Sequence, residues 1–186
     1  TMNLDVVLGE LEKAETAMAG SSSSEQSGSD KSVDLLGMEL SGINDAASAL
    51  VLARADAAEK AGLTPRARIV GYAVAGVRPE VMGIGPVPAV QALMARTGLK
   101  AADFDVIESN EAFAAQALAV SKALGLDPAR VNPNGGAIAL GHPVGATGAI
   151  LTVKTLYELE RTGGKFGLIT MCIGGGQGIA IAIERL

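Results

Sequence analysis

The sequence predicts one α/β domain in which helices cover both faces of a five-stranded mixed sheet. From about residue 41 onward, short apolar runs bounded by glycine alternate with segments of helical periodicity. The runs are so apolar that both faces of each strand should be covered, as in sheets with parallel strands. The composition agrees with this architecture, because 48% of the 186 residues are hydrophobic and 24 are glycine, which suits a core of small side chains.

The first forty residues differ from the rest of the chain. Leucine and valine at helical spacing predict a short helix from Asn3 to Ala19, within a first segment of residues 1–19. Residues 20–40 open with a serine-rich stretch without apolar side chains, which cannot offset the entropy lost on ordering. We therefore expect a helical segment, then a linker, and then the main domain at residues 41–186.

Five strands and four helices are predicted in the main domain. Proline in the first turn opens the second helix, and glycine follows the other three, as is common at helix carboxyl ends. The predicted strands are Ala47–Ala53, Arg68–Val77, Phe104–Ser109, Phe166–Cys172 and Gly178–Glu184. The predicted helices are Ala55–Ala61, Pro86–Arg96, Glu111–Leu124 and Gly145–Arg161.

Charge and cysteine content exclude several classes of protein. The net charge of −5 argues against a nucleic-acid partner, which requires a clustered basic surface. The single cysteine, Cys172, excludes an internal disulfide framework and favours a reducing compartment. The sequence shows no uncharged apolar run of membrane-spanning length and no secretory signal, so we expect a soluble cytoplasmic protein without a membrane partner.

Polar or glycine-rich residues follow two predicted strands and open one predicted helix. The segments are Glu108–Phe113, Asn132–Gly148 and Met171–Gly178. In open α/β sheets, ligands bind beyond the carboxyl ends of the strands, and both Asn110 and Cys172 are predicted to lie there. The sequence therefore predicts a functional site at this edge of the sheet.

Two of the candidate residues have a structural and a functional interpretation. Asn110 could cap the helix that begins at Glu111, or its amide could hold a water or a thioester oxygen where negative charge develops. His142 is the only histidine, and a lone histidine is most often structural. Its position between Gly141 and Pro143, ahead of a helix start, would instead leave a neutral and accessible imidazole.

Cys172 could be a small buried hydrophobe or a reactive thiol. Three glycines follow at positions 174–176, and their N–H groups could stabilise both a thiolate and an oxyanion. A phosphate-binding loop is disfavoured, because no Lys-Ser/Thr pair follows these glycines.

Three motifs together resemble those of the second half of the thiolase family, over roughly Ser41 to Leu186. They are Asn110-Glu-Ala-Phe113, Gly141-His-Pro-Val-Gly145 and Cys172-Ile-Gly-Gly-Gly-Gln-Gly178. The resemblance implies a thiolase-like carboxyl-terminal domain. It also implies the family's acyltransferase activity, which is thiolytic cleavage or Claisen condensation of 3-ketoacyl-CoA, with coenzyme A or acyl-CoA as substrate and no permanently bound cofactor or metal.

The resemblance also implies residue roles. His142 would activate the nucleophile and contribute to an oxyanion hole, and Asn110 would hold the water of that hole. Cys172 would move a proton to and from the α-carbon, and the N–H of Gly174 would belong to a second oxyanion hole. The residues implied to contact the pantetheine arm of coenzyme A are Ser41, Met82, Ala112 and Phe113.

The acylated cysteine of thiolases lies in their amino-terminal half, and Cys172 is the only cysteine here. We therefore expect the chain to act as the half that supplies the base and the oxyanion donors. Its partner would be a second copy or a separate amino-terminal half. Two alternatives stay open, namely an inactive CoA-binding or scaffolding relative of the thiolases, and an unrelated hydrolase that uses Cys172 and His142 as a dyad.

Overall fold

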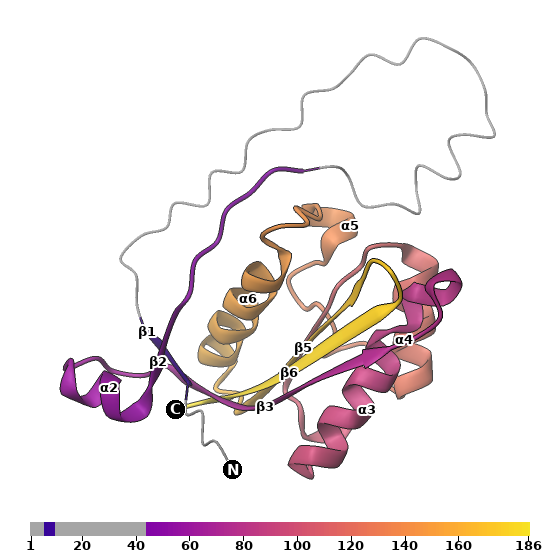
Figure 1. The fold of residues 1–186 in the computed structure, drawn as a ribbon. Helices are drawn as coiled ribbons and strands as arrows, with labels where there is room; N and C mark the ends of the chain where they lie inside the picture. The colour runs from indigo at the N-terminus through magenta and orange to yellow at the C-terminus, as the bar shows by residue number, and fades with distance from the viewer. Residues whose placement is uncertain (1–5, 10–43) are drawn as a thin grey trace.

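A computed structural model describes residues 6–9 and 44–186 of the chain (Figure 1). Its elements in chain order are β1 (Val6–Gly9), β2 (Val51–Arg54), α2 (Ala55–Lys60), β3 (Ala67–Gly76), η1 (Pro79–Ile84), α3 (Pro86–Thr97), η2 (Ala101–Asp103), β4 (Val106–Ser109), α4 (Ala114–Leu124), α5 (Ala137–Leu140), α6 (Thr147–Thr162), β5 (Phe166–Ile173) and β6 (Gln177–Arg185). None of the helices in these residues is long and apolar enough to span a membrane.

The predicted mixed α/β sheet is confirmed, with one more strand than expected. Its six strands have the order β2-β1-β3-β6-β5-β4. Only β4 and β5 are parallel, and the other neighbours are antiparallel. All five strands predicted in the main domain are present, although the first begins at Val51 instead of Ala47.

The additional strand is β1, and it corrects the expectation of a helix over Asn3–Ala19. The backbone of Val6–Gly9 pairs with β2, and Val7 also pairs with Arg68 of β3. Pairing at the sheet outweighs the local helical spacing, as tertiary context commonly does. The other residues of that expected helix, the serine-rich linker and Ser41 lie outside the described residues.

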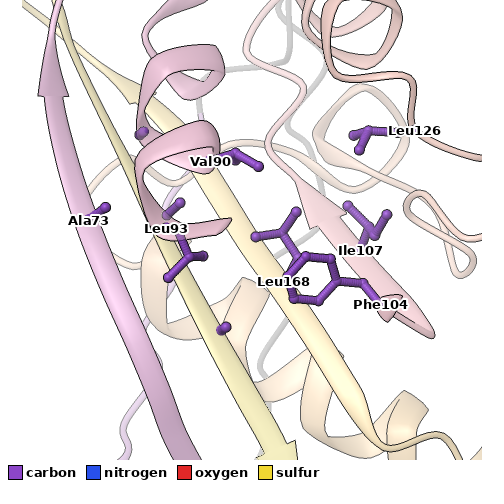
Figure 2. Close-up of a cluster of buried hydrophobic side chains, with 10 residues drawn as sticks. Ala73, Val90, Leu93, Phe104, Ile107, Leu126 and Leu168 are labelled. Carbon is purple, nitrogen blue, oxygen red and sulfur yellow. The ribbon is translucent and has the colours of Figure 1, made fainter. Parts of the chain in front are cut away.

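Helices cover both faces of the sheet, as the apolar strands require. Figure 1 shows α6 on one side and α3 on the other, and α3 contributes Val90 and Leu93 to a core with Leu168 of β5 (Figure 2). On the opposite face, Leu156 and Leu159 of α6 pack against Val106, Ile169 and Ile183. Each fully buried aliphatic side chain of this kind contributes about 1.5–3 kcal/mol, so the two clusters hold the sheet between its helices.

The carboxyl ends of β3, β4 and β5 meet at one edge of the sheet. Gln177, at the start of β6, pairs with both Gly76 at the end of β3 and Ile173 at the end of β5. Ser109, at the end of β4, pairs with Thr170 of β5. The turn after β5 and the segments after β3 and β4 therefore lie together at this edge, which we call the site edge.

Backbone contact between glycines fixes the β5–β6 turn at the site edge. A Cβ on Gly178 would lie 2.0 Å from the carbonyl oxygen of Gly85, and a Cβ on Gly85 would lie 2.3 Å from that of Gln177. Backbone atoms cannot move aside as a side chain can. Only glycine therefore allows the end of η1 to pack directly against β6.

We expect Gly178→Ala to lower the free energy of unfolding by about 2 kcal/mol or more, because its methyl group would overpack this contact. Gly174 in the same turn is the matched control, since a Cβ there would meet no atom within 4 Å. Urea unfolding of both variants tests the contact. Equal stability of Gly178→Ala and Gly174→Ala would contradict it.

Candidate active site

Asn110 and Cys172 lie on neighbouring parallel strands at the site edge, as expected. The backbone N–H of Asn110, the residue after β4, donates a hydrogen bond to the carbonyl of Thr170 at 2.9 Å. Cys172 lies two residues beyond Thr170, near the end of β5. The topology thus brings together two residues that are 62 positions apart in the sequence.

The cap interpretation of Asn110 is wrong. Helix α4 begins at Ala114 and not at Glu111, its N-cap residue is Phe113, and no side chain caps it. Asn110 is 2% exposed, and its Nδ2 lies 3.3 Å from Nε2 of His142. Its Oδ1 is buried without a hydrogen-bond partner among the described residues. The Nδ2 group of Asn110 is thus directed at the imidazole, and within the described part of the chain the amide oxygen Oδ1 remains an unused hydrogen-bond acceptor.

Hydrogen bonds assign the tautomer of His142. The Thr147 hydroxyl donates to the carbonyl of Pro143 at 2.9 Å, so its oxygen accepts from Nδ1–H of His142 at 2.7 Å. Nε2 then carries the lone pair and accepts from Nδ2–H of Asn110. A neutral histidine with an unprotonated Nε2 can accept a proton and afterwards donate it as N–H.

Partial burial lowers the pKa of the His142 imidazole below its ordinary value of 6.5. Between that value and the lower folded pKa, the unfolded chain binds more protons than the folded chain. We therefore expect stability from this group to be complete above pH 6.5 and to fall as the pH drops toward the folded pKa. An NMR titration of this single histidine should have its midpoint below 6.5, and a midpoint above 6.5 would contradict the assignment.

Residues that sequence reasoning did not identify hold the loop before His142 in place. Asn132 accepts from the N–H of Ser109 and donates to the carbonyl of Ser109 and to Glu111, each at 2.9 Å. Asn132 itself has the left-handed φ of 46°, which asparagine tolerates better than most residues. The other carboxylate oxygen of Glu111 accepts from the N–H of Ile138 at 3.2 Å. These bonds tie the loop and α5 to the end of β4.

Asn44, which is far from His142 in the sequence, makes a second contact to this loop. Its Oδ1 accepts from the backbone N–H of His142 at 3.2 Å. Gly141 has a φ of 97°, which favours glycine, and a Cβ there would lie 2.4 Å from the same oxygen, so a larger residue would displace the Asn44 side chain. The segment around residue 44 therefore contributes to the site, although no pattern in the sequence connects it to His142.

Cys172 is half-buried, and burial raises the pKa of its thiol. The glycine turn therefore does not stabilise the thiolate enough to outweigh desolvation, contrary to that part of the sequence interpretation. Side chains alternate along β5, so Cys172 shares the face of Leu168, which belongs to the core beneath α3. Among the described residues no hydrogen bond joins the thiol to His142, whose two ring nitrogens bond to Thr147 and Asn110.

Gly174 opens the turn between β5 and β6 at the site edge. It is exposed, and its Cβ position is open space. The next two residues, Gly175 and Gly176, have φ values of 84° and 92°, which glycine alone adopts without strain. A ligand can therefore approach the backbone of this turn closely.

Met82, Ala112 and Phe113 lie near this turn. Met82 is in η1, which packs against α4, β5 and β6. Ala112 and Phe113 directly precede α4, and Ala112 is buried whereas Phe113 is half-buried. The structure thus brings three of the four expected pantetheine-contacting residues to the site edge, and the fourth, Ser41, lies outside the described residues.

Together these groups define an α/β domain suited to acyl chemistry. A neutral imidazole, an amide, a thiol and exposed glycine N–H groups surround one sheet edge, where they could move a proton and stabilise an oxyanion. Within residues 6–9 and 44–186, no cluster of three or more His, Cys, Asp or Glu side chains could hold a metal ion.

The comparisons with known proteins identify the family. Residues 63–185 match the family described as "Thiolase, C-terminal domain". Beta-ketothiolase BktB of Cupriavidus necator is 63% identical over 146 residues, which are 78% of this chain and 37% of that protein. The acetyl-CoA acetyltransferase of Bacillus anthracis superposes with a TM-score of 0.78 at 50% identity, over 80% of this chain and 38% of its own.

A third match is human mitochondrial 3-ketoacyl-CoA thiolase in complex with CoA, with a TM-score of 0.76 at 49% identity, over 80% of this chain and 38% of that one. The chain belongs to the thiolase family and contains its carboxyl-terminal domain. It spans less than two-fifths of the length of these three proteins.

Proposed function

We propose that this chain supplies the proton-transfer and oxyanion-binding half of a thiolase active site. The reaction is thiolytic cleavage of a 3-ketoacyl-CoA, or its formation by Claisen condensation of two acyl-CoA molecules. The observation that carries the proposal is the bond between Asn110 and His142 at the edge where Cys172 lies near the end of β5. The acylated cysteine comes from a second half, either in a longer protein that contains this sequence or in another chain.

Cys172 is the proton donor and acceptor for the α-carbon. In cleavage, the thiolate of the second half's cysteine attacks the 3-keto carbon, the C–C bond breaks, the acetyl-CoA enolate leaves, and its α-carbon takes the proton from Sγ. The thiol of coenzyme A then takes the acyl group from that cysteine. In condensation, the Cys172 thiolate removes the same proton, and the enolate carbon attacks the acylated cysteine of the other half. The raised pKa of Cys172 keeps its thiol protonated, which is the form that cleavage uses.

His142 and Gly174 stabilise the oxygens on which negative charge develops. Nε2 of His142 carries a lone pair, so it can accept the proton of the nucleophilic thiol and afterwards donate it to an oxyanion. Asn110 holds the water of the same oxyanion hole. The N–H of Gly174 serves the second oxyanion hole, which suits its exposed position in the β5–β6 turn.

The pantetheine arm of the CoA substrate passes over η1 and the start of α4. Met82 and Phe113 are half-buried and Ala112 is buried, so they present apolar surface beside the turn that holds Gly174. Ser41 would contact the same arm.

An exposed apolar surface supports the presence of a second half. Tyr72 and Val74 of β3 are 59% and 54% exposed. Ala73 between them points into the core beneath α3, so alternation places both side chains on the face that carries α6. Exposed apolar surface of this kind marks interaction sites.

Thiolysis of acetoacetyl-CoA tests the proposal, measured with this chain alone and with this chain mixed with the amino-terminal half of a thiolase relative. We call the mixture the reconstituted enzyme. Turnover should appear only in the mixture, and only when the added half retains its nucleophilic cysteine. A mixture that forms a complex but stays inactive would favour the inactive scaffolding function instead.

Thioester hydrolysis by the chain alone, lost in Cys172→Ala, would indicate a hydrolase. The structure argues against that outcome, because a nucleophile–base dyad requires a hydrogen bond between the two side chains, and none joins Cys172 to His142 among the described residues.

A further inference from the structure

An ion pair with a fully buried carboxylate lies close to Asn110 along β4. Glu108 is fully buried in β4, two residues before Asn110, and Nζ of Lys154 from α6 donates to its Oε2 at 2.7 Å. Lys154 also donates to the carbonyl of Gly135 at 2.6 Å. An ammonium group has three donors, so these bonds leave one N–H for another acceptor. Neither proton transfer nor oxyanion binding, as proposed above, uses this pair.

A cavity of about 30 Å³ is lined by both Asn110 of the site and Lys154 of the ion pair. Its wall includes Asn110, Gly136, Thr147, Leu151 and Lys154. The unpartnered Oδ1 belongs to the cavity-lining Asn110, and Oε1 of Glu108 is a second buried oxygen without a partner among the described residues. A cavity of this size holds one water, and buried waters typically make about three hydrogen bonds.

We propose that Lys154, Glu108 and one water in this cavity form a positioning unit that fixes the amide of Asn110. The water accepts from the third N–H of Lys154 and donates to Oδ1 of Asn110. Its second hydrogen is directed to Oε1 of Glu108. Every donor and acceptor in the unit then has a partner, which a buried polar network requires.

This unit decides which end of the Asn110 amide faces His142. A water that donates to Oδ1 holds the oxygen in the cavity, so Nδ2–H must point at the imidazole. Nε2 of His142 then has to be the acceptor, and its proton stays on Nδ1, bonded to Thr147. With the amide reversed, Oδ1 would instead stabilise a proton on Nε2 and remove the lone pair. Lys154 and Glu108 are therefore positioning residues that act on His142 through Asn110.

The test follows the ring nitrogens of His142 by ¹⁵N NMR, which reports the tautomer of the only histidine in the chain. The wild-type chain should show one tautomer, protonated at Nδ1. The double variant Glu108→Leu/Lys154→Met removes both buried charges together, a change that commonly preserves folding. We expect it to lose the single tautomer, so that the two nitrogen shifts converge toward a mixture.

Two further variants calibrate this readout. Thr147→Val removes the acceptor of Nδ1–H and should shift the tautomer as well. Lys122→Met, on an exposed part of α4, should leave both shifts unchanged. A wild-type chain protonated at Nε2, or a double variant with wild-type shifts, would overturn the proposal.

A high-resolution crystal structure of the wild-type chain provides a test that needs no variant. Density for a water within hydrogen-bond distance of Oδ1 of Asn110 and Nζ of Lys154 is expected, and a cavity filled by side chains would overturn the proposal. The inference rests on the proposed roles of Asn110 and His142, but both readouts are structural. A chain without thiolase turnover could therefore still confirm the positioning unit. Failure of the proposed function and failure of the positioning unit are thus distinguishable.

Discussion

Cys172→Ala should lower the rate of acetoacetyl-CoA thiolysis by the reconstituted enzyme about a thousandfold. The loss follows from the absence of the group that protonates the α-carbon, because a positioned acid or base typically contributes about 10²- to 10⁴-fold. The acyl-enzyme on the other half should form far more slowly from acetoacetyl-CoA, since an enolate that is not protonated can re-form the C–C bond. Steady-state kinetics and mass spectrometry of the acyl-enzyme would measure the two effects.

Cys172→Ser is the matched control for this result. Serine keeps the approximate size of the side chain, but its hydroxyl is a far weaker acid than the thiol. If Cys172 only fills space beside the turn, Cys172→Ser should retain turnover. We expect Cys172→Ser to be as inactive as Cys172→Ala, with a melting temperature close to that of the wild-type chain. Substantial activity of Cys172→Ser would contradict the proton-transfer role.

His142→Ala should lower the turnover of the reconstituted enzyme to a similar extent, about a thousandfold, without unfolding the domain. The variant removes both the acceptor for the nucleophilic thiol and an oxyanion donor, and one such donor alone can contribute about 10²- to 10³-fold. The side chain is half-buried, and the bonds that it loses are those to Asn110 and Thr147. Circular dichroism would verify the fold, and steady-state kinetics would measure kcat and KM.

Val144→Ala is the control for His142→Ala, because Val144 lies in the same loop and is 77% exposed. It should change neither stability nor turnover by a large factor. If His142→Ala retained wild-type turnover while Val144→Ala behaved the same, the role given to the histidine would be wrong.

The strand ends, and with them Asn110 and Cys172, were predictable from the sequence. The apolar run of β4 ends at the polar residues Ser109 and Asn110, that of β5 ends at the glycines of positions 174–176, and parallel strands bring those ends to one edge. The start of α4 was not predictable from periodicity. Residues 110–113 have helical spacing with the segment that follows, but Asn110 bonds to β5 and His142, and Glu111 bonds to the loop before α5.

The supporting contacts of the site were hidden by their separation in the sequence. Asn44 reaches His142 across 98 positions, and Asn132 reaches β4 across 23. No local pattern encodes such pairs, because the partners become neighbours only after the sheet forms. Thr147 is different, since it lies only five residues after His142, at the start of the helix that follows the histidine loop, where a side chain could be expected to contact the imidazole.

The carboxylate of Glu108 within an apolar strand indicated a buried partner, which an analysis of hydrophobic periodicity does not detect. A carboxylate in an apolar strand covered on both faces needs a cation or a proton, because isolated buried charges are very costly. Lys154 of α6 is the matching cation. Burial nevertheless raises the pKa of Glu108, and the contact with Lys154 only partly opposes this effect.

Loss of α-deuterium from trideuteroacetyl-CoA tests the central claim most directly, because it isolates the base and the oxyanion donors from the nucleophile. The measurement uses this chain mixed with an amino-terminal half whose nucleophilic cysteine has been replaced by alanine, and mass spectrometry follows the exchange into water. We expect exchange to proceed in this mixture and to be lost in Cys172→Ala. Exchange that persists in Cys172→Ala would show that the base lies elsewhere and would contradict the role proposed for Cys172.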